Sequence, residues 1–170
     1  MKTLKHGLSS LLLLAASSSI LSATPTFEQT GVKEGNNKLS VSLFNRFPDG
    51  GDPSITLNAE LGHFLTDDIE LTFNTLVSQT QGDTLYYLQP GANYYFLKTP
   101  TLTPYAGGQV YYFGQTGDNS TSGFGNNYHI GAHKFFSENV SITGEAGMDF
   151  FEFTDYLQSY TNVYFTYFFD

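Results

Sequence analysis

Eight segments of the chain alternate apolar and polar side chains with a period of two residues. This alternation is the pattern of a β-strand with one apolar face and one polar face. In the second segment, for example, the apolar Leu57 and Ala59 lie on either side of the polar Asn58. The segments cover about residues 38–47, 54–65, 69–78, 84–97, 102–114, 123–136, 140–153 and 158–169. The sequence therefore predicts an all-β chain in which successive strands run antiparallel.

The connections between these segments alternate in kind. Longer polar stretches follow the first, third, fifth and seventh segments, and QTGDNSTSG at 115–123 is the longest of them. Shorter turns follow the second, fourth and sixth segments. Pro90 lies inside the fourth segment, and because proline cannot donate to a strand ladder it predicts a local bulge there. We expect the longer loops at one rim and the turns at the other.

Eight antiparallel strands of this length close into a small barrel that leaves no free edge. The polar face carries few Lys and Glu, and charged residues make up only 14% of the chain, against about 25% in soluble domains. Aromatic residues reach 16% and crowd the strand ends. These features predict a barrel with its apolar face outward, as in a membrane. The absence of Cys and the net charge of −9 argue against thiol chemistry and nucleic-acid binding.

The N-terminus has the three parts of a secretory signal. Lys2 and Lys5 precede an apolar run at 11–16, and Ser22-Ala23 offers small residues for cleavage. We therefore predict a signal peptide at 1–23, a flexible lead-in at 24–37 and the barrel at 38–170.

Two motifs give the chain a family resemblance. Gly62-His63-Phe64-Leu65-Thr66-Asp67-Asp68, with a related turn near 131–139, combines glycine, an aromatic residue and a short acidic turn. The last strand ends with aromatic residues at alternate positions, namely Phe165, Tyr167 and Phe169. In these features the chain resembles the small eight-stranded outer-membrane β-barrels of Gram-negative bacteria, a group that includes the transmembrane domain of outer membrane protein A and outer membrane protein X.

The resemblance implies a fold, a location and a set of partners. It implies an eight-stranded antiparallel up-and-down transmembrane β-barrel in the outer membrane, reached by secretion across the inner membrane. Its partners would be outer-membrane lipid and lipopolysaccharide, with periplasmic chaperones and the barrel-assembly machinery during biogenesis. The aromatic C-terminal strand would be the signal that this machinery reads. We expect a monomer that binds no nucleic acid.

The polar face also contains ionisable residues, which we expect to form a network inside the barrel. They are Lys38, Arg46, Glu60, Glu70, His129, His133, Glu145 and Asp149. Isolated charges are costly in a narrow lumen, so these groups are expected to pair. His129 falls almost opposite Glu145, which fits either an acid–base pair or, as we favour, a structural plug. His129 and His133 are about 13 Å apart along a strand, too far to share a metal.

We expect a non-enzymatic outer-membrane barrel with a structural or surface-contact role. An eight-stranded barrel is just wide enough for its own side chains, which excludes a general diffusion pore. The sequence predicts no catalytic residue, cofactor or metal site. The first alternative is a lipid-modifying outer-membrane enzyme, although the His-x-Ser motif of the barrel deacylases is absent. The second is a soluble periplasmic barrel that binds an apolar ligand.

Overall fold

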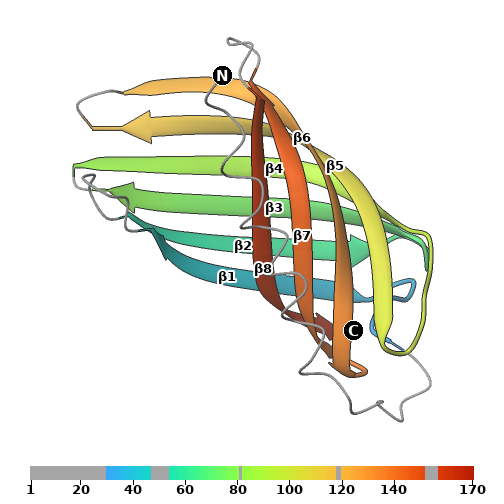
Figure 1. Cartoon of the computed structure of the whole chain (residues 1–170). Coiled ribbons are helices and arrows are strands. Elements are labelled where there is room, and N and C mark those ends of the chain that lie inside the picture. The colour runs from blue at the N-terminus through green and yellow to red at the C-terminus, as the bar shows by residue number, and fades with distance from the viewer. Residues whose placement is uncertain (1–29, 47–53, 81, 118–119, 152–156) are drawn as a thin grey trace, which may run out of the picture.

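The computed structural model describes residues 30–46, 54–80, 82–117, 120–151 and 157–170, without the side chains of 44–46 and 157. Eight strands form a closed barrel in sequence order, and every neighbouring pair is antiparallel (Figure 1). They are β1 (Asn37–Arg46), β2 (Ser54–Phe64), β3 (Ile69–Thr80), β4 (Asp83–Tyr95), β5 (Leu102–Thr116), β6 (Thr121–Ser137), β7 (Val140–Phe151) and β8 (Leu157–Phe169). The predicted all-β up-and-down barrel is confirmed. No described segment forms a helix long and apolar enough to cross a membrane.

The connections divide the barrel into two ends. The turn end carries 65–68, 96–101 and 138–139 together with Asp170. At the opposite end, the loop end, β1, β3, β5 and β7 finish and β2, β4, β6 and β8 begin. The connections at the loop end were expected to be longer than those at the turn end, and this difference is only partly present. Residues 81–82 alone join β3 to β4, whereas the turn at 96–101 is longer than expected. The strands continue further than their alternation shows, because Gly82 (φ +92°) and Gly117 (φ +118°) allow tight reversals close to the ladder.

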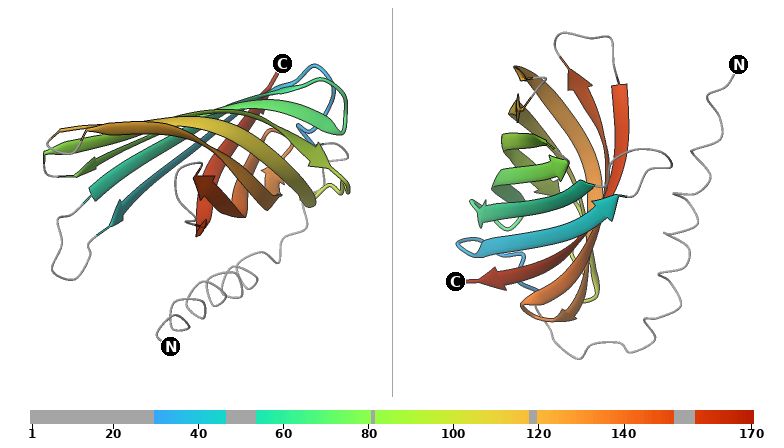
Figure 2. Two further views of the ribbon diagram at one scale, coloured as in Figure 1. Left: turned by 90° about the horizontal axis from the view of Figure 1, so that it is seen from above. Right: turned by 90° about the vertical axis from the view of Figure 1, so that its left-hand side faces the viewer.

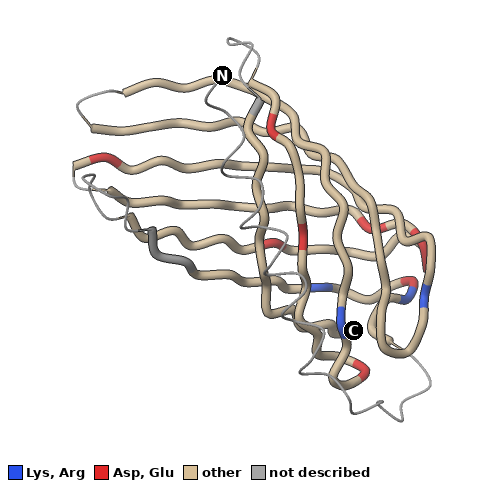
Figure 3. The backbone as a smooth tube through the Cα atoms, viewed as in Figure 1, with Lys and Arg blue, Asp and Glu red and all other residues tan. Residues whose placement is uncertain are grey.

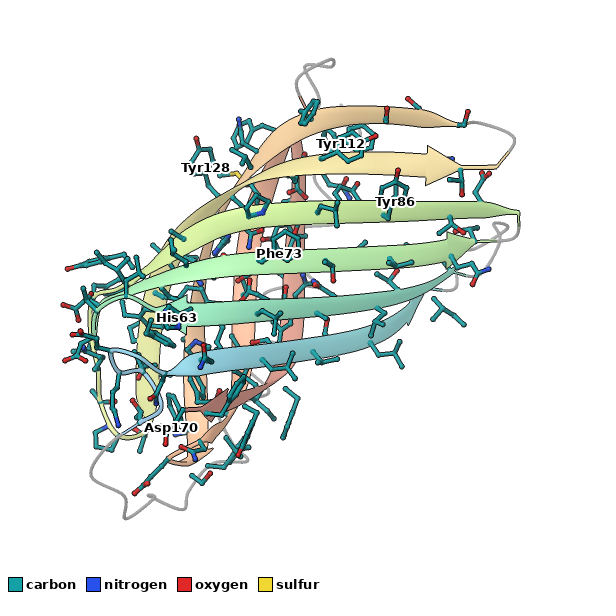
Figure 4. All side chains as sticks on the ribbon, turned by 180° about the vertical axis from the view of Figure 1, so that it is seen from behind. His63, Phe73, Tyr86, Tyr112, Tyr128 and Asp170 are labelled. Atoms are coloured by element: carbon teal, nitrogen blue, oxygen red, sulfur yellow. The ribbon has the colours of Figure 1, made fainter. Side chains whose placement is uncertain are left out.

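The barrel has its apolar side chains outside and its polar side chains inside. Among the most exposed are Leu43, Ile130 and Val110, at 67%, 66% and 63% of their surface. Figure 4 shows labelled outer side chains, including Phe73 and Tyr128, along the wall. The interior instead buries polar side chains, including Asn58, Asn74, Asn93, Gln109, Asn127 and Thr166. The predicted orientation of the two faces is confirmed at Leu57, Phe73, Val110, Ile130, Ile142 and Phe165, which are all exposed.

Pro90 interrupts one ladder without shifting it. On the β3 side it remains paired with Phe73. On the β5 side the pairing passes from Leu88–Tyr112 directly to Gly91–Gln109, so the register is unchanged across the gap. The predicted bulge is therefore wrong. The only change is that hydrogen bonds of the β4–β5 ladder next to Pro90 are missing, because proline has no N–H.

The closing pair of strands is the least complete in the barrel. β1 and β8 pair only from Asn37–Phe169 to Val41–Phe165. Beyond these pairs the described residues of β1 (42–46) and β8 (157–164) have no ladder partner on each other. In Figures 1 and 2 the two strands separate from this point toward the loop end, as β7 and β8 cross the direction of β1 to β4 at a steep angle. We call this boundary the β1–β8 seam.

The described part of the lead-in, 30–37, packs against the turn end of the barrel. The backbone N–H groups of Gly35 and Phe64 bond to the carbonyls of Phe64 and Asn36. Val32 is buried against the aromatic residues that close the turn end. Gly31 lies so close to Phe168 that a side chain there would overlap it. The sequence did not indicate this packing, because Val32 is the single apolar residue of 30–37. The flexibility of the lead-in stays a prediction. The signal peptide predicted at 1–23 lies outside the described residues.

Candidate functional site

A buried ion cluster lies inside the barrel near the turn end. Lys38 on β1 points inward because the alternation of its strand places it on the same face as Ser40. Its Nζ atom lies 2.9 Å from Glu60 Oε1 and 2.7 Å from Glu70 Oε1. All three side chains are at most 6% exposed. Buried charges are tolerated when they pair in this way, since an unpaired charge in a low-dielectric interior is very costly.

The cluster includes neutral side chains from the next strand. Glu70 Oε2 accepts hydrogen bonds from Lys38 Nζ at 2.9 Å, from Asn93 Nδ2 at 2.9 Å and from Tyr95 Oη at 2.7 Å. A side chain at position 62 would overlap the Glu70 carboxylate, so Gly62 provides the space that this carboxylate occupies. The glycine in the motif Gly62-His63-Phe64 therefore serves the interior of the barrel.

Tyr95 connects the ion cluster to His133. Because the Tyr95 hydroxyl hydrogen is donated to Glu70, its oxygen must accept from His133 Nε2, which lies 3.1 Å away. This assigns the ring proton of His133 to Nε2. Nδ1 is then an acceptor, and the hydroxyl of Thr143 lies 2.6 Å from it. Four strands, β3, β4, β6 and β7, are joined by hydrogen bonds that all point in one direction.

The same direction continues through β8 and returns to β1. Since Thr143 donates to His133, it accepts from Thr166, whose Oγ1 is 2.7 Å away. Thr166 in turn accepts from Ser40 at 3.0 Å. Ser40 is two residues from Lys38, so the contacts close a circuit round the barrel. We name it the polar ring, formed by Lys38, Glu60, Glu70, Tyr95, His133, Thr143, Thr166 and Ser40.

A second cluster surrounds Glu145. Its Oε2 accepts a hydrogen bond from Tyr105 at 2.8 Å, and its Oε1 accepts from Tyr160 at 3.1 Å. His129 Nε2 lies 3.8 Å from Oε2. The structure therefore brings together the predicted pair of His129 and Glu145, at a distance longer than a hydrogen bond and with two tyrosines as the closer partners of the carboxylate.

Both ring nitrogens of His129 face amide oxygens. Nε2 lies 2.8 Å from Asn93 Oδ1, and Nδ1 lies 2.7 Å from Asn127 Oδ1. The amide orientations are fixed, because Asn93 Nδ2 donates to Glu70 and Asn127 Nδ2 donates to Asp149. A neutral ring donates to one of these two oxygens, and Asn127 Oδ1 also accepts from Tyr160 Oη at 3.2 Å.

The structure separates the predicted lumen residues into three groups. Glu60, Glu70 and His133 are in the polar ring, and His129 and Glu145 are in the second cluster. Asp149 is half-buried and reaches the second cluster through Asn127. The backbone of Arg46 ends β1, but its side chain lies outside the described ones. The aromatic residues proposed as an assembly signal, Phe165, Tyr167 and Phe169, lie on the exposed face of β8.

Sequence reasoning missed the hydroxyl groups of the polar ring. In the alternation of their strands, Ser40, Thr143 and Thr166 occupy inward-facing positions. This alternation was the sequence signal that could have identified them. Their contact with one another depends on the register of three strands, which alternation alone does not provide.

The contact between the Thr143 hydroxyl and His133 resembles a nucleophile next to a base. Both side chains are at most 2% exposed, and the Thr143 oxygen is also bonded to Thr166. A substrate has no access to this hydroxyl in the structure. In the part of the chain that the structure describes, no group of three or more His, Asp or Glu side chains is arranged to hold a metal ion. The arrangement is suited to holding strands together.

An aromatic cap seals the interior at the turn end. The rings of Phe64 and Tyr95 have centroids 5.3 Å apart, and those of Phe135 and Phe168 are 5.2 Å apart. Val32 completes this buried cluster. The cap therefore closes the interior on the turn side of the polar ring. The described basic residues also lie toward this end (Figure 3).

Solved structures share this fold. The N-terminal β-barrel domain of Pseudomonas aeruginosa OprF aligns with a TM-score of 0.60 and 18% identity, over 79% of this chain and 98% of that chain. Neisserial surface protein A aligns with a TM-score of 0.54 and 11% identity, over 78% and 93%. Ail, the attachment invasion locus protein of Yersinia pestis, aligns with a TM-score of 0.54 and 14% identity, over 80% and 99%. No protein-family model and no curated protein matches the sequence. These similarities show that the chain has the fold of small transmembrane β-barrels.

Proposed function

We propose that this chain is a non-enzymatic outer-membrane β-barrel with a structural or surface-contact role. The observation that carries the proposal is the inverted distribution of its side chains, with large apolar residues outside and a hydrogen-bonded ionic network inside. Such a surface is stable against hydrocarbon, and closed barrels satisfy their backbone groups in a membrane. In this proposal the turn end faces the periplasm and the loop end faces outward.

The polar ring and the aromatic cap support a structural role over a pore. Side chains from seven strands, all but β5, form the polar ring near the turn end, and the cap lies below them. Lipopolysaccharide and outer-membrane lipid would surround the apolar belt. Periplasmic chaperones and the barrel-assembly machinery would deliver the chain, with the exposed face of β8 as the recognised strand. We propose that the protein acts as a monomer.

Fractionation of cells that express the chain tests the location. We expect the protein in outer membranes after a wash with alkaline carbonate, and its release only by detergent. Recovery from the soluble periplasm would overturn the proposal and favour the soluble barrel. The enzyme alternative is tested separately by mass spectrometry of lipid A from cells with and without the protein. A new lipid A species that requires Thr143 and His133 would replace the structural role with a catalytic one.

A further inference from the structure

The lead-in reverses direction immediately before it enters β1. Phe64 N donates to the Asn36 carbonyl at 2.9 Å, which extends the pairing of β1 with β2 by one residue. Asn36 N then donates to the Lys33 carbonyl at 3.2 Å. Gly35 has a φ of +84°, a left-handed conformation that glycine adopts without steric cost. The residues before this turn therefore do not continue the direction of β1.

The turn brings the lead-in from β2 across the start of β1 to β8. Gly31 lies against Phe168 on β8, so closely that a Cβ atom at position 31 would overlap the Phe168 side chain. The Gly31 carbonyl accepts a hydrogen bond at 3.2 Å from Asn36 Nδ2, and the Asn36 side chain is buried. In Figure 2 the described lead-in and the last residues of β8 lie together at the turn end. We define residues 30–36 as the strap, because they connect the two strands that flank β1.

The strap is anchored in the aromatic cap. Val32 is 4% exposed and belongs to one buried cluster with Phe64, Tyr95, Tyr105, Phe135 and Phe168. These five aromatic residues come from β2, β4, β5, β6 and β8. The rings of Phe64 and Phe168 have centroids 6.2 Å apart, and they meet only when the last strand has joined the first. The environment that buries Val32 is therefore a property of the closed barrel.

The turn between β2 and β3 holds the other side of the strap. Glu34 N donates to Asp67 Oδ1 at 2.9 Å. Lys98 fixes this turn, because its Nζ atom donates to the Asp67 carbonyl at 2.9 Å and lies 2.8 Å from Asp68 Oδ1. A hollow of about 290 Å³ lies between the strap and the turn at 96–101. The strap is thus held at a few points, and it can detach without the loss of any residue pair between the eight strands.

The strap crosses the barrel at its shortest ladder. Within the described residues β1 and β8 form five pairs, from Asn37–Phe169 to Val41–Phe165. Every other neighbouring pair of strands forms at least ten. Local opening costs least where few contacts have to be broken. Contacts that join β2 to β8 therefore have their largest effect on this ladder.

We propose that the strap is a releasable fastener that holds the β1–β8 ladder shut at the turn end. With the strap docked, Gly31 and Val32 cover Phe168 and keep the end of β8 against β1. With the strap released, the five pairs open locally. β8 then stays attached to β7, because the β7–β8 ladder is intact and Phe168 N donates to the Asn139 carbonyl at 2.8 Å. The strap therefore sets how often the last strand separates from the first, in a membrane or in detergent.

Amide hydrogen exchange, measured residue by residue by NMR on the folded protein in detergent micelles, tests this role. Gly31→Leu adds a side chain where Phe168 leaves no room and so releases the strap. In this variant we expect at least tenfold faster exchange at the amides of 37–41 and 165–169 that donate across the β1–β8 ladder. Exchange at 106–110, in the middle of β5, should change less than twofold.

Glu34→Leu is the matched control, because it adds the same side chain at an exposed position of the strap. It should leave exchange unchanged in all three segments. Unchanged exchange across the β1–β8 ladder in Gly31→Leu would show that the strap does not hold this ladder. Equal acceleration at 106–110 would show a general loss of stability, and it would overturn the fastener as well.

A smaller change keeps the test decisive if Gly31→Leu does not fold. Val32→Ala removes apolar contact from the aromatic cap, and Lys33→Ala is its control because Lys33 is exposed. We expect at least threefold faster exchange across the β1–β8 ladder in Val32→Ala and no change in Lys33→Ala. The same exchange in both variants would refute the fastener.

Discussion

The hydroxyl of Tyr95 donates to Glu70 Oε2 over 2.7 Å, and this bond joins β4 to β3 inside the barrel. It fixes the direction of the hydrogen bonds that follow, from His133 back to Ser40. Removing this hydroxyl separates the ion cluster from the rest of the polar ring.

Replacing Tyr95 with Phe should destabilise the barrel by about 1–3 kcal/mol, because a buried carboxylate and a buried imidazole each lose a partner. The control is Tyr94→Phe, one residue away on the outer face, where the side chain is 55% exposed. Its effect should stay below about 0.5 kcal/mol. Urea unfolding in lipid vesicles measures both free energies. Equal values for the two variants would contradict the role of the Tyr95 hydroxyl.

Lys38→Met should cost about 3–5 kcal/mol, because it leaves Glu60 and Glu70 buried without their cation. The triple variant that also carries Glu60→Gln and Glu70→Gln should recover most of this loss, since no net charge remains uncompensated. Lys98→Met removes a partly exposed pair with Asp68 and should change the unfolding free energy by less than about 1 kcal/mol. A triple variant as unstable as Lys38→Met alone would show that packing, and not charge, is the main contribution of Lys38.

Val163→Arg should destabilise the folded barrel in vesicles by about 2–4 kcal/mol, because it places a cation in hydrocarbon. Asn162→Arg points into the lumen, where Glu145 is its ladder partner, and should cost less than about 1 kcal/mol. Folding free energies in vesicles of matched thickness provide the measurement. The opposite order would invert the inner and outer faces of β8.

Cysteine at Ser120, in the loop between β5 and β6, should react with a membrane-impermeant maleimide on intact cells. Cysteine at Asp68, in a turn at the opposite end, should react only after the outer membrane is opened. The expectation follows from the even strand number, which returns the chain to its starting side. Labelling of the Asp68 variant alone on intact cells would reverse the proposed topology.

The alternation of side chains was sufficient to predict the eight strands and their two faces. Each strand needs only its own sequence for this, as at β2, where Asn58 is buried and Leu57 exposed. Features that depend on register were not predictable in this way. The contact between Thr143 and Thr166 depends on the pairing of β7 with β8. The point at which the β1–β8 ladder stops depends on how the first and last strands are tilted relative to each other. The buried Val32 was missed because a single apolar residue has no period.

The polar ring includes residues from both the first and the last strand, and this has a consequence for the order of assembly. Thr166 lies between Thr143 of β7 and Ser40 of β1, so a nascent chain that lacks β8 can form only an open series of these contacts, which ends at Thr143. Buried hydrogen bonds strengthen one another when the network is complete. The arrival of the final strand therefore links the Thr143 end of this series to Ser40 of the first strand and completes the network. A chain stopped before Thr166 would remain an open sheet, recognisable to quality-control proteases as unfinished.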